Sequence, residues 1–285
     1  MLQRVVLCLA LSAMVLQAQT VPLYKQAGAP IDARVSDLLA RMTLEEKFWQ
    51  LFMIPGDLDN PANDYSQGIF GLQIRGPVSQ RREPTGEDTG VQGALDPKRV
   101  NEIQKYFVEK TRLGIPIIPF EEAVHGLAQP GNTMFPAAIG LAATWDPKLM
   151  SLVASTIAAE TRARGIRQVL APVVNIADDV RWGRVEETYG EDPYLASMMT
   201  RAYVSAFEKA GIVTTPKHFV ANVGEGGRDS YPIEHSERVL AERYFPPFEA
   251  ALAAGARSVM YSKSSDGRRL SIDISVKSGL AFAPV

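Results

Sequence analysis

Charged side chains that could bind a hydroxylated ligand lie in three separate segments of the chain. The segments read EEAVHG at residues 121–126, DVRWGRVEE at residues 179–187 and KHF at residues 217–219. A carboxylate accepts hydrogen bonds from two neighbouring hydroxyl groups, and an Arg guanidinium presents a fixed fork of donors. A Trp offers a flat apolar face to a sugar ring. These residue types therefore favour a ligand that carries many hydroxyl groups.

Each segment also has a simpler structural explanation. Arg181 and Arg184 could pair with the glutamates that follow them, on a loop exposed to solvent. Lys217 and His218 could belong to a buried ion pair, and Glu122 could be a carboxylate at the start of a helix. The sequence leaves both explanations open.

A pattern that occurs three times predicts the elements that position these segments. Each copy begins with Asp-Pro, continues through a run of helix-forming residues and ends with Gly-Ile, at residues 96–115, 146–166 and 192–212. Asp is a good N-cap, Pro at the first helical position has no N–H to leave unpaired, and Gly adopts the left-handed geometry that ends a helix. Each copy therefore predicts one helix followed by one strand.

The predicted strands are nearly continuous apolar runs, which is typical of parallel strands buried on both faces. They read IPIIPF at 115–120, QVLAPVV at 168–174 and IVTTPKHF at 212–219. Glu121, Glu122 and His125 follow the first strand, Asn175 follows the second, and the third ends in Lys217 and His218. Polar residues at the carboxyl ends of parallel strands mark the active-site face of a (β/α) barrel. The predicted fold class is therefore α/β, of the TIM type.

The number of strands falls short of a complete barrel. Further strands are predicted at residues 68–75 and 258–262, which makes five, whereas a closed barrel has about eight. We therefore expect an incomplete barrel with about five to six of the eight βα units. The segments 55–67 and 76–95 are expected to be connections without strands, and a helix at 236–254 is expected to be interrupted at Pro246-Pro247. After about residue 262 the sequence predicts irregular structure.

The composition excludes several classes of protein. The chain has 285 residues, a formal net charge of −2, 46% hydrophobic residues and interspersed charges. Without a basic stripe it does not fit a nucleic-acid surface, and its hydrophobic content does not fit a disordered chain. One large domain at residues 19–285 accounts for this length.

The N-terminus is typical of a secretory signal peptide over residues 1–18. Arg4 precedes an apolar stretch at 5–16 that is too short to span a bilayer, and Gln17-Ala18-Gln19 offers a small-residue cleavage site. Cleavage would remove Cys8, the single cysteine, and leave a mature chain without an integral membrane span. We expect a secreted or periplasmic protein. A lipid anchor at Cys8 and an uncleaved membrane anchor are the alternatives.

Four ordered motifs resemble the N-terminal barrel of glycoside hydrolase family 3, in its β-glucosidase group. They are EEAVHG, FPAAIGLAATWDP, DDVRWGRVEETYGEDP and KHFVANVGEGGRDS, within about residues 30–262. The β-N-acetylhexosaminidase branch typically has Pro-Gly-His-Gly after its Lys-His, where this chain has residues 220–225 as VANVGE. The resemblance implies a retaining exo-glycosidase that releases terminal non-reducing β-D-glucosyl residues from a small glucoside or oligosaccharide. It implies no cofactor, and three His residues without ligand spacing give no support for a metal.

The resemblance assigns four substrate-binding residues. Glu122 takes the place of a carboxylate that is usually Asp in the family, and Arg184, Lys217 and His218 match the other sugar-binding positions. Because Glu is one methylene longer than Asp, the resemblance does not fix the hydroxyl preference at this position.

No catalytic residue is expected in this chain. The family's nucleophile is the Asp of a Ser-Asp motif at the end of a later strand, and its acid/base residue usually comes from a second domain. Asp266 follows Ser265 but lies too soon after Tyr261, and Asp273 has no preceding Ser. The expected protein is thus C-terminally truncated. A catalytically inactive saccharide-binding remnant is one alternative, and a barrel aldolase that uses Lys217 as a Schiff base is another.

Overall fold

The computed structural model describes residues 21–82, 88–229 and 231–262, which form two compact units divided between Lys47 and Phe48. The predicted signal peptide, with Cys8, and the segment after residue 262 lie outside the described residues. Among the described residues, no helix has the length and apolar character needed to cross a membrane.

The first unit consists of short helices. They are the 3₁₀-helix η1 (Leu23–Lys25), α2 (Ile31–Arg41) and the first turn of α3 (Leu44–Trp49). The start of α3 is a capping box, in which Glu46 N–H donates to Thr43 Oγ1 at 3.1 Å and Thr43 N–H donates to Glu46 Oε2 at 2.8 Å. Two backbone donors at the helix start are thereby satisfied.

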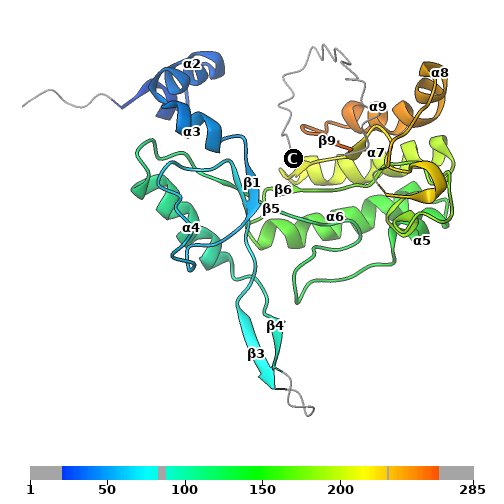
Figure 1. Ribbon diagram of the computed structural model, residues 1–285, viewed down its shortest axis with the longest axis horizontal. Helices are drawn as coiled ribbons and strands as arrows, with labels where there is room; N and C mark the ends of the chain where they lie inside the picture. The colour runs from blue at the N-terminus through cyan, green and yellow to red at the C-terminus, as the bar shows by residue number, and fades with distance from the viewer. Residues whose placement is uncertain (1–20, 83–87, 230, 263–285) are drawn as a thin grey trace, which may run out of the picture. The chain divides into compact units, whose positions relative to one another are not determined.

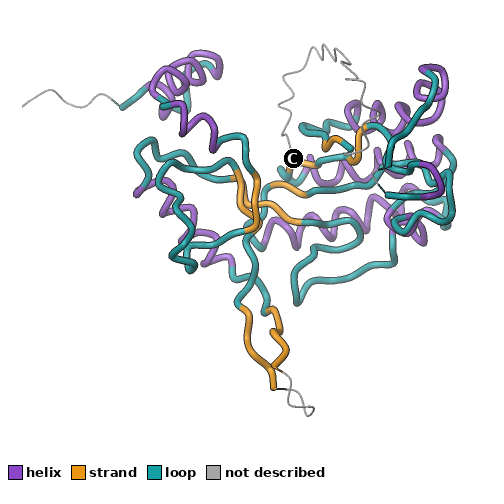
Figure 2. The backbone as a smooth tube through the Cα atoms, viewed as in Figure 1, coloured by secondary structure: helices purple, strands orange, loops and turns teal. Residues whose placement is uncertain are grey.

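The second unit is built on a parallel sheet in the order β1-β2-β5-β6-β7 (Figure 2). The strands are β1 (Met53–Pro55), β2 (Gly71–Gln73), β5 (Ile118–Glu121), β6 (Gln168–Val169) and β7 (Val213–Thr214). β8 (Lys217–Phe219) follows β7 closely and pairs in parallel with β9 (Met260–Tyr261). Within the described ranges these strands do not close on themselves, so the fold is an incomplete TIM-type barrel.

Three long helices follow the Asp-Pro pairs, as the repeated pattern predicts. They are α4 (Pro97–Lys110), α6 (Pro147–Ala163) and α7 (Pro193–Lys209). Asp96, Asp146 and Asp192 each accept a hydrogen bond from a backbone N–H in the first turn of the helix that follows. The cap prediction is therefore confirmed in all three copies.

The helix ends agree with the prediction in two copies. After α6 and α7, Gly165 and Gly211 have φ of 85° and 76°, and the following Ile166 and Ile212 donate back to the last helical turn at 3.3 Å and 3.1 Å. This is the Schellman arrangement. The first copy differs, because α4 ends at Lys110 and Gly114 N–H donates to Thr111 Oγ1 at 3.2 Å instead.

The structure corrects the prediction of which strand comes first and the prediction that 76–95 is a connection without strands. β1 precedes the strand that was expected to be the first, and a three-residue strand is too short to show a hydrophobic period. The segment 76–95 contains an antiparallel hairpin of β3 (Val78–Arg82) and β4 (Asp88–Gln92), which projects from the rest of the unit in Figure 1. Its strands are polar, so the sequence carries no apolar alternation to predict them.

The predicted helix at 236–254 is interrupted just before its prolines. It consists of α8 (Glu237–Val239), a π-helical turn η4 (Leu240–Tyr244) and α9 (Phe245–Ala253). Pro246 and Pro247 stand in the first turn of α9, where a missing N–H leaves no hydrogen bond broken.

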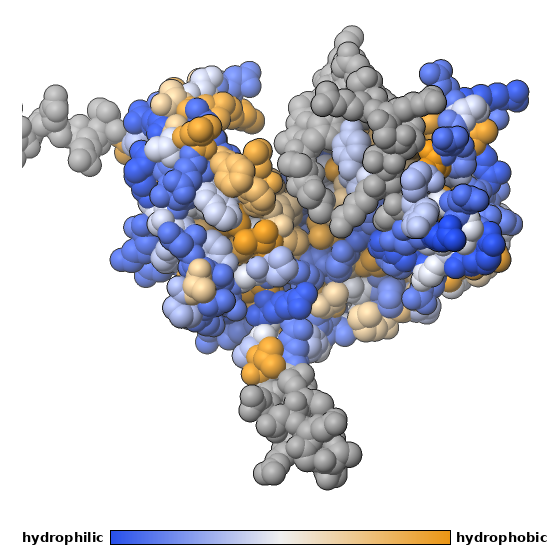
Figure 3. Space-filling view, viewed as in Figure 1, coloured by the Kyte–Doolittle hydropathy of each residue, from blue (hydrophilic) through white to orange (hydrophobic). Residues whose placement is uncertain are grey.

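The core lies between the sheet and the helices, with α7 packed against both α6 and α9. Phe107, Ile157, Tyr203 and Phe207 are fully buried, and the rings of Tyr203 and Phe207 stack at 4.5 Å. Hydrophilic residues cover much of the face seen in Figure 3, with hydrophobic residues in smaller groups. The remaining helices are α5 (Ala138–Ala142), η2 (Val185–Glu187) and η3 (Glu225–Gly227).

Candidate functional site

The centre of the candidate site is an ion pair between Lys217 and Glu122. Glu122 comes directly after β5, and Lys217 is the first residue of β8. Lys217 Nζ donates to both carboxylate oxygens of Glu122, at 2.7 Å each. The Lys217 side chain is 3% exposed, whereas the Glu122 side chain is 37% exposed. Glu122 is therefore the member of the pair that faces the outside.

Burial acts against the charges of this pair. It raises the pKa of Glu122 and lowers the pKa of Lys217, and in each case the charge of the partner opposes the shift. The two short hydrogen bonds favour the charged forms, so the pair holds its charges only because each group has the other.

Arg184 connects a second acidic residue to the site. Its Nε and Nη2 donate to Glu187 Oε1 at 2.6 Å and Oε2 at 2.8 Å, a bidentate pair that raises the pKa of Arg184. Its Nη1 lies 3.2 Å from His218 Nε2. The simpler expectation, that Arg184 pairs with a following glutamate, is thus confirmed together with its contact to His218.

His218 is held from its other side by Asn175. Asn175 Oδ1 accepts from the His218 backbone N–H at 2.8 Å and lies 3.0 Å from His218 Nδ1, while Asn175 Nδ2 donates to the His218 carbonyl at 2.8 Å. Burial, followed by the charges of Arg184 and Lys217, lowers the pKa of His218 to about 3. The imidazole is therefore neutral at physiological pH. The sequence placed Asn175 at a strand end but gave no sign of this contact.

Other polar residues of the same segments have structural roles. Glu121 is buried and accepts hydrogen bonds from Gln73 and Gln129 at 2.5 Å each. His125 Nδ1 lies 2.8 Å from the Phe135 carbonyl. Neither residue joins the ion pair of Glu122.

Two neighbours of Arg184 do not face a ligand as the sequence suggested. Trp182 is 2% exposed and donates from Nε1 to Asp229 Oδ1 at 2.8 Å, so the interpretation of its ring as a platform for a sugar is wrong. Arg181 is 68% exposed in its side chain and pairs with Asp179. Residue type alone predicted neither the burial of Trp182 nor the pairing of Arg181, because both depend on the path of the loop after β6.

The four predicted residues therefore form one continuous cluster. Glu122 contacts Lys217, His218 follows Lys217 in the chain, and Arg184 contacts His218. Glu122 follows β5, Arg184 lies on the loop after β6, and Lys217 and His218 follow β7 as the first residues of β8. Carboxylate, ammonium, guanidinium and imidazole together offer both donors and acceptors to hydroxyl groups.

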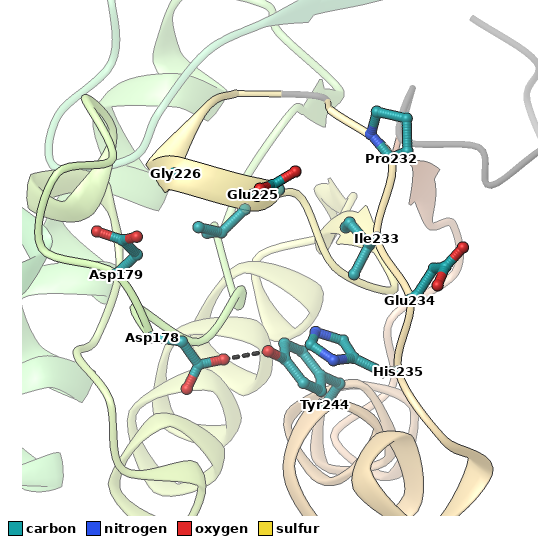
Figure 4. Close-up of a pocket in the computed structure, with 11 residues that line it drawn as sticks. Asp178, Asp179, Glu225, Gly226, Pro232, Ile233, Glu234, His235 and Tyr244 are labelled. Atoms are coloured by element: carbon teal, nitrogen blue, oxygen red, sulfur yellow. Dashed lines mark hydrogen bonds between the residues drawn. The ribbon is translucent and has the colours of Figure 1, made fainter.

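A pocket of about 670 Å³ lies between the loops that follow β6 and β8 (Figure 4). Asp178 and Asp179 line it from one loop, and residues 223–226 and 232–235 from the other. The His235 ring stacks on Tyr244 at 4.7 Å, and the Tyr244 hydroxyl donates to Asp178. None of the four clustered residues is among those that line the pocket, so we place the candidate site at the cluster and not in the pocket.

Comparison with known proteins identifies the family of the chain. The family model for the glycosyl hydrolase family 3 N-terminal domain matches residues 43–276. The chain belongs to glycosyl hydrolase family 3. This family 3 chain is 31% identical over 241 residues to the periplasmic beta-glucosidase of Salmonella typhimurium, covering 82% of the chain and 29% of that protein. It is 42% identical over 165 residues to a beta-xylosidase of Formosa agariphila, covering 52% of the chain and 23% of that protein.

Solved structures of the family resemble the fold. A b-glucosidase from Erythrobacter marinus superposes with a TM-score of 0.70 at 30% identity, covering 84% of this chain and 32% of that one. A beta-glucosidase from Listeria innocua, solved in complex with isofagomine, gives a TM-score of 0.67 at 25% identity, covering 82% of this chain and 32% of that one. The family 3 chain thus spans about a third or less of the length of these four relatives.

The ion pair predicts a coupled effect on stability. Lys217→Met should lower the free energy of unfolding by about 3 kcal/mol, because it leaves the Glu122 carboxylate partly buried without its partner. Adding Glu122→Gln should cost less than the sum of the two single changes. Urea unfolding of the wild type, both single variants and the double variant measures this coupling.

The exposed pair of Arg238 and Glu242 provides the control. These side chains are 82% and 59% exposed, so Arg238→Met should change the unfolding free energy little. Additive effects of Lys217→Met and Glu122→Gln would show that the buried pair is not coupled.

Proposed function

We propose that this chain forms the sugar-binding part of a retaining exo-glycosidase, which releases terminal non-reducing β-D-glucosyl residues from β-glucosides and oligosaccharides. The observation that carries the proposal is the contact cluster of Glu122, Lys217, His218 and Arg184, which come from the segments that follow β5, β6 and β7. Family membership and the printed names of the relatives support it.

Each clustered group has a role in this proposal. The exposed Glu122 carboxylate accepts hydrogen bonds from two vicinal hydroxyls of the terminal sugar. The Lys217 ammonium donates to hydroxyl oxygens, as do the Arg184 N–H groups that Glu187 and His218 do not use. His218 contacts Arg184 at the same site. The substrate is a small glucoside or oligosaccharide, and no cofactor takes part.

The choice of glucose as the bound sugar is part of the proposal. Relatives with similar identity carry the names beta-glucosidase and beta-xylosidase, so the family alone does not select one sugar. Glucose differs from xylose by its hydroxymethyl group.

Glucose binding should depend on Arg184. Arg184→Ala should weaken the binding of glucose by at least about tenfold, because a charge-assisted hydrogen bond contributes about 1.5–3 kcal/mol. Titration of the purified chain with glucose, followed by NMR chemical shifts, measures the dissociation constant.

Arg181→Ala is the matched control, since Arg181 belongs to the same RWGR segment but pairs with Asp179 outside the cluster. It should leave glucose binding unchanged. Equal losses in both variants, or a wild-type chain that does not bind glucose, would contradict the proposal.

Turnover by this chain alone is not expected. We assign it no nucleophile and no acid/base residue, and ground-state binding alone does not lower the chemical barrier. An aryl β-glucoside should therefore be hydrolysed no faster than background, and extension through a Ser-Asp strand and a second domain should restore hydrolysis with retention. Clear hydrolysis by the 285-residue chain that is lost on replacing Asp266 or Asp273 would show that the nucleophile is misplaced.

We also propose that the protein is secreted or periplasmic, with residues 1–18 as a cleaved signal peptide. The periplasmic beta-glucosidase among the relatives supports this localisation. The exported protein should begin at Gln19, which N-terminal sequencing tests; an intact Met1 on exported protein would contradict it.

A further inference from the structure

The orientation of the Asn175 side chain is determined by its partners. The His218 backbone N–H is always a donor and the His218 carbonyl is always an acceptor, so Oδ1 must face the first and Nδ2 the second, as they do at 2.8 Å each. The reverse orientation would place two donors together and two acceptors together inside the protein. Asn175 is 1% exposed and His218 is 8% exposed, so water does not resolve such a mismatch.

This orientation determines where the proton on the imidazole lies. His218 Nδ1 lies 3.0 Å from Asn175 Oδ1, which can only accept, so Nδ1 carries the hydrogen. His218 Nε2 lies 3.2 Å from Arg184 Nη1, which can only donate, so Nε2 is unprotonated. Two independent contacts, on opposite sides of the ring, thus require the same neutral tautomer.

We propose that Asn175 is a positioning residue that holds His218 in its Nδ1–H tautomer and so keeps Nε2 available as the hydrogen-bond acceptor for Arg184 Nη1. This inference rests on the proposed function for its consequence, because the contact with Nε2 orients the Arg184 guanidinium that is proposed to donate to sugar hydroxyls. The tautomer of His218 thereby contributes to the position of a sugar-binding side chain.

The backbone holds Asn175 opposite His218. Val173 forms a parallel bridge with Lys217, in which Lys217 N–H donates to the Pro172 carbonyl at 3.0 Å and Val174 N–H donates to the Lys217 carbonyl at 2.9 Å. The register of these two segments therefore brings Asn175 beside His218 before any side chain is considered.

The electrostatic surroundings favour the same state. Arg184 and Lys217 lower the pKa of His218, and Asp229 acts in the opposite direction. A protonated Nε2 would also direct its hydrogen at the Arg184 guanidinium. The neutral ring should therefore persist across the pH range in which an ordinary His titrates.

Nitrogen-15 NMR of the full chain labelled at histidine tests the proposal. The chain has three His residues, and the spectrum of His218→Gln assigns the His218 signals. In the wild type, Nδ1 should have the shift of a protonated ring nitrogen and Nε2 that of an unprotonated one, without titration between about pH 5 and 8, where a free imidazole titrates.

Three variants distinguish a role of Asn175 in positioning His218 from a general contribution of Asn175 to the fold. Asn175→Ala removes the acceptor at Nδ1 and, when combined with Arg184→Ala so that Nε2 no longer faces a donor, should move His218 mainly to the Nε2–H tautomer. Asn175→Asp keeps an acceptor at Nδ1 and should retain the Nδ1–H tautomer, with a raised pKa from the added carboxylate. Gln168→Ala removes another buried amide, bonded to Thr215 and Ser258, and should leave the His218 signals unchanged.

The outcomes decide the proposal. An Nδ1–H tautomer that persists in the folded double variant Asn175→Ala/Arg184→Ala, or an equal change in Gln168→Ala, would overturn it. If the double variant does not fold, an unchanged His218 pKa in Asn175→Asp would overturn it as well. Glucose titration adds a separate readout, with binding weakened about tenfold in Asn175→Ala if one directed hydrogen bond is lost. Failure of the wild type to bind glucose would refute the proposed function alone, since the tautomer measurement does not depend on it.

Discussion

The site depends on the burial of one ammonium group. Lys217 lies almost completely out of contact with water, and an unpaired buried charge is too costly for a folded protein to retain. The partner that compensates it, Glu122, is 95 residues away in the chain. The pairing therefore connects the region after β5 to the start of β8, where the next residue, His218, contacts Arg184 and Asn175.

The structural and functional explanations of these charged residues are compatible. Lys217 does belong to a buried ion pair, and Arg184 does pair with a glutamate on its own loop. Both pairs neutralise charges that would otherwise be unpaired when no ligand is bound. Because Glu122 keeps 37% of its side chain exposed, the same pair can still present acceptors to a ligand. A polar site has to satisfy its own charges when no ligand is bound and still leave polar atoms that a ligand can reach.

Much of the framework of the fold could be predicted because it rests on local rules. The Asp caps and the glycines after α6 and α7 act within a few residues of their own position, so their roles are legible in the sequence. The predictions were wrong where pairing between distant segments decided the outcome. β1 exists because Met53 and Ile54 pair with Gly71 and Leu72, and the hairpin of β3 and β4 exists through backbone pairing of polar strands.

The sequence by itself determined the residue types of the candidate site and the strands that present them. It could not determine the states of Lys217, His218 and Trp182, because their deciding partners are remote. Trp182 is buried and donates to Asp229, which is 47 residues away. His218 contacts Asn175 and Arg184, which are 43 and 34 residues away. Whether an imidazole donates or accepts depends on the atoms that face its two nitrogens, and only the tertiary structure brings those atoms together.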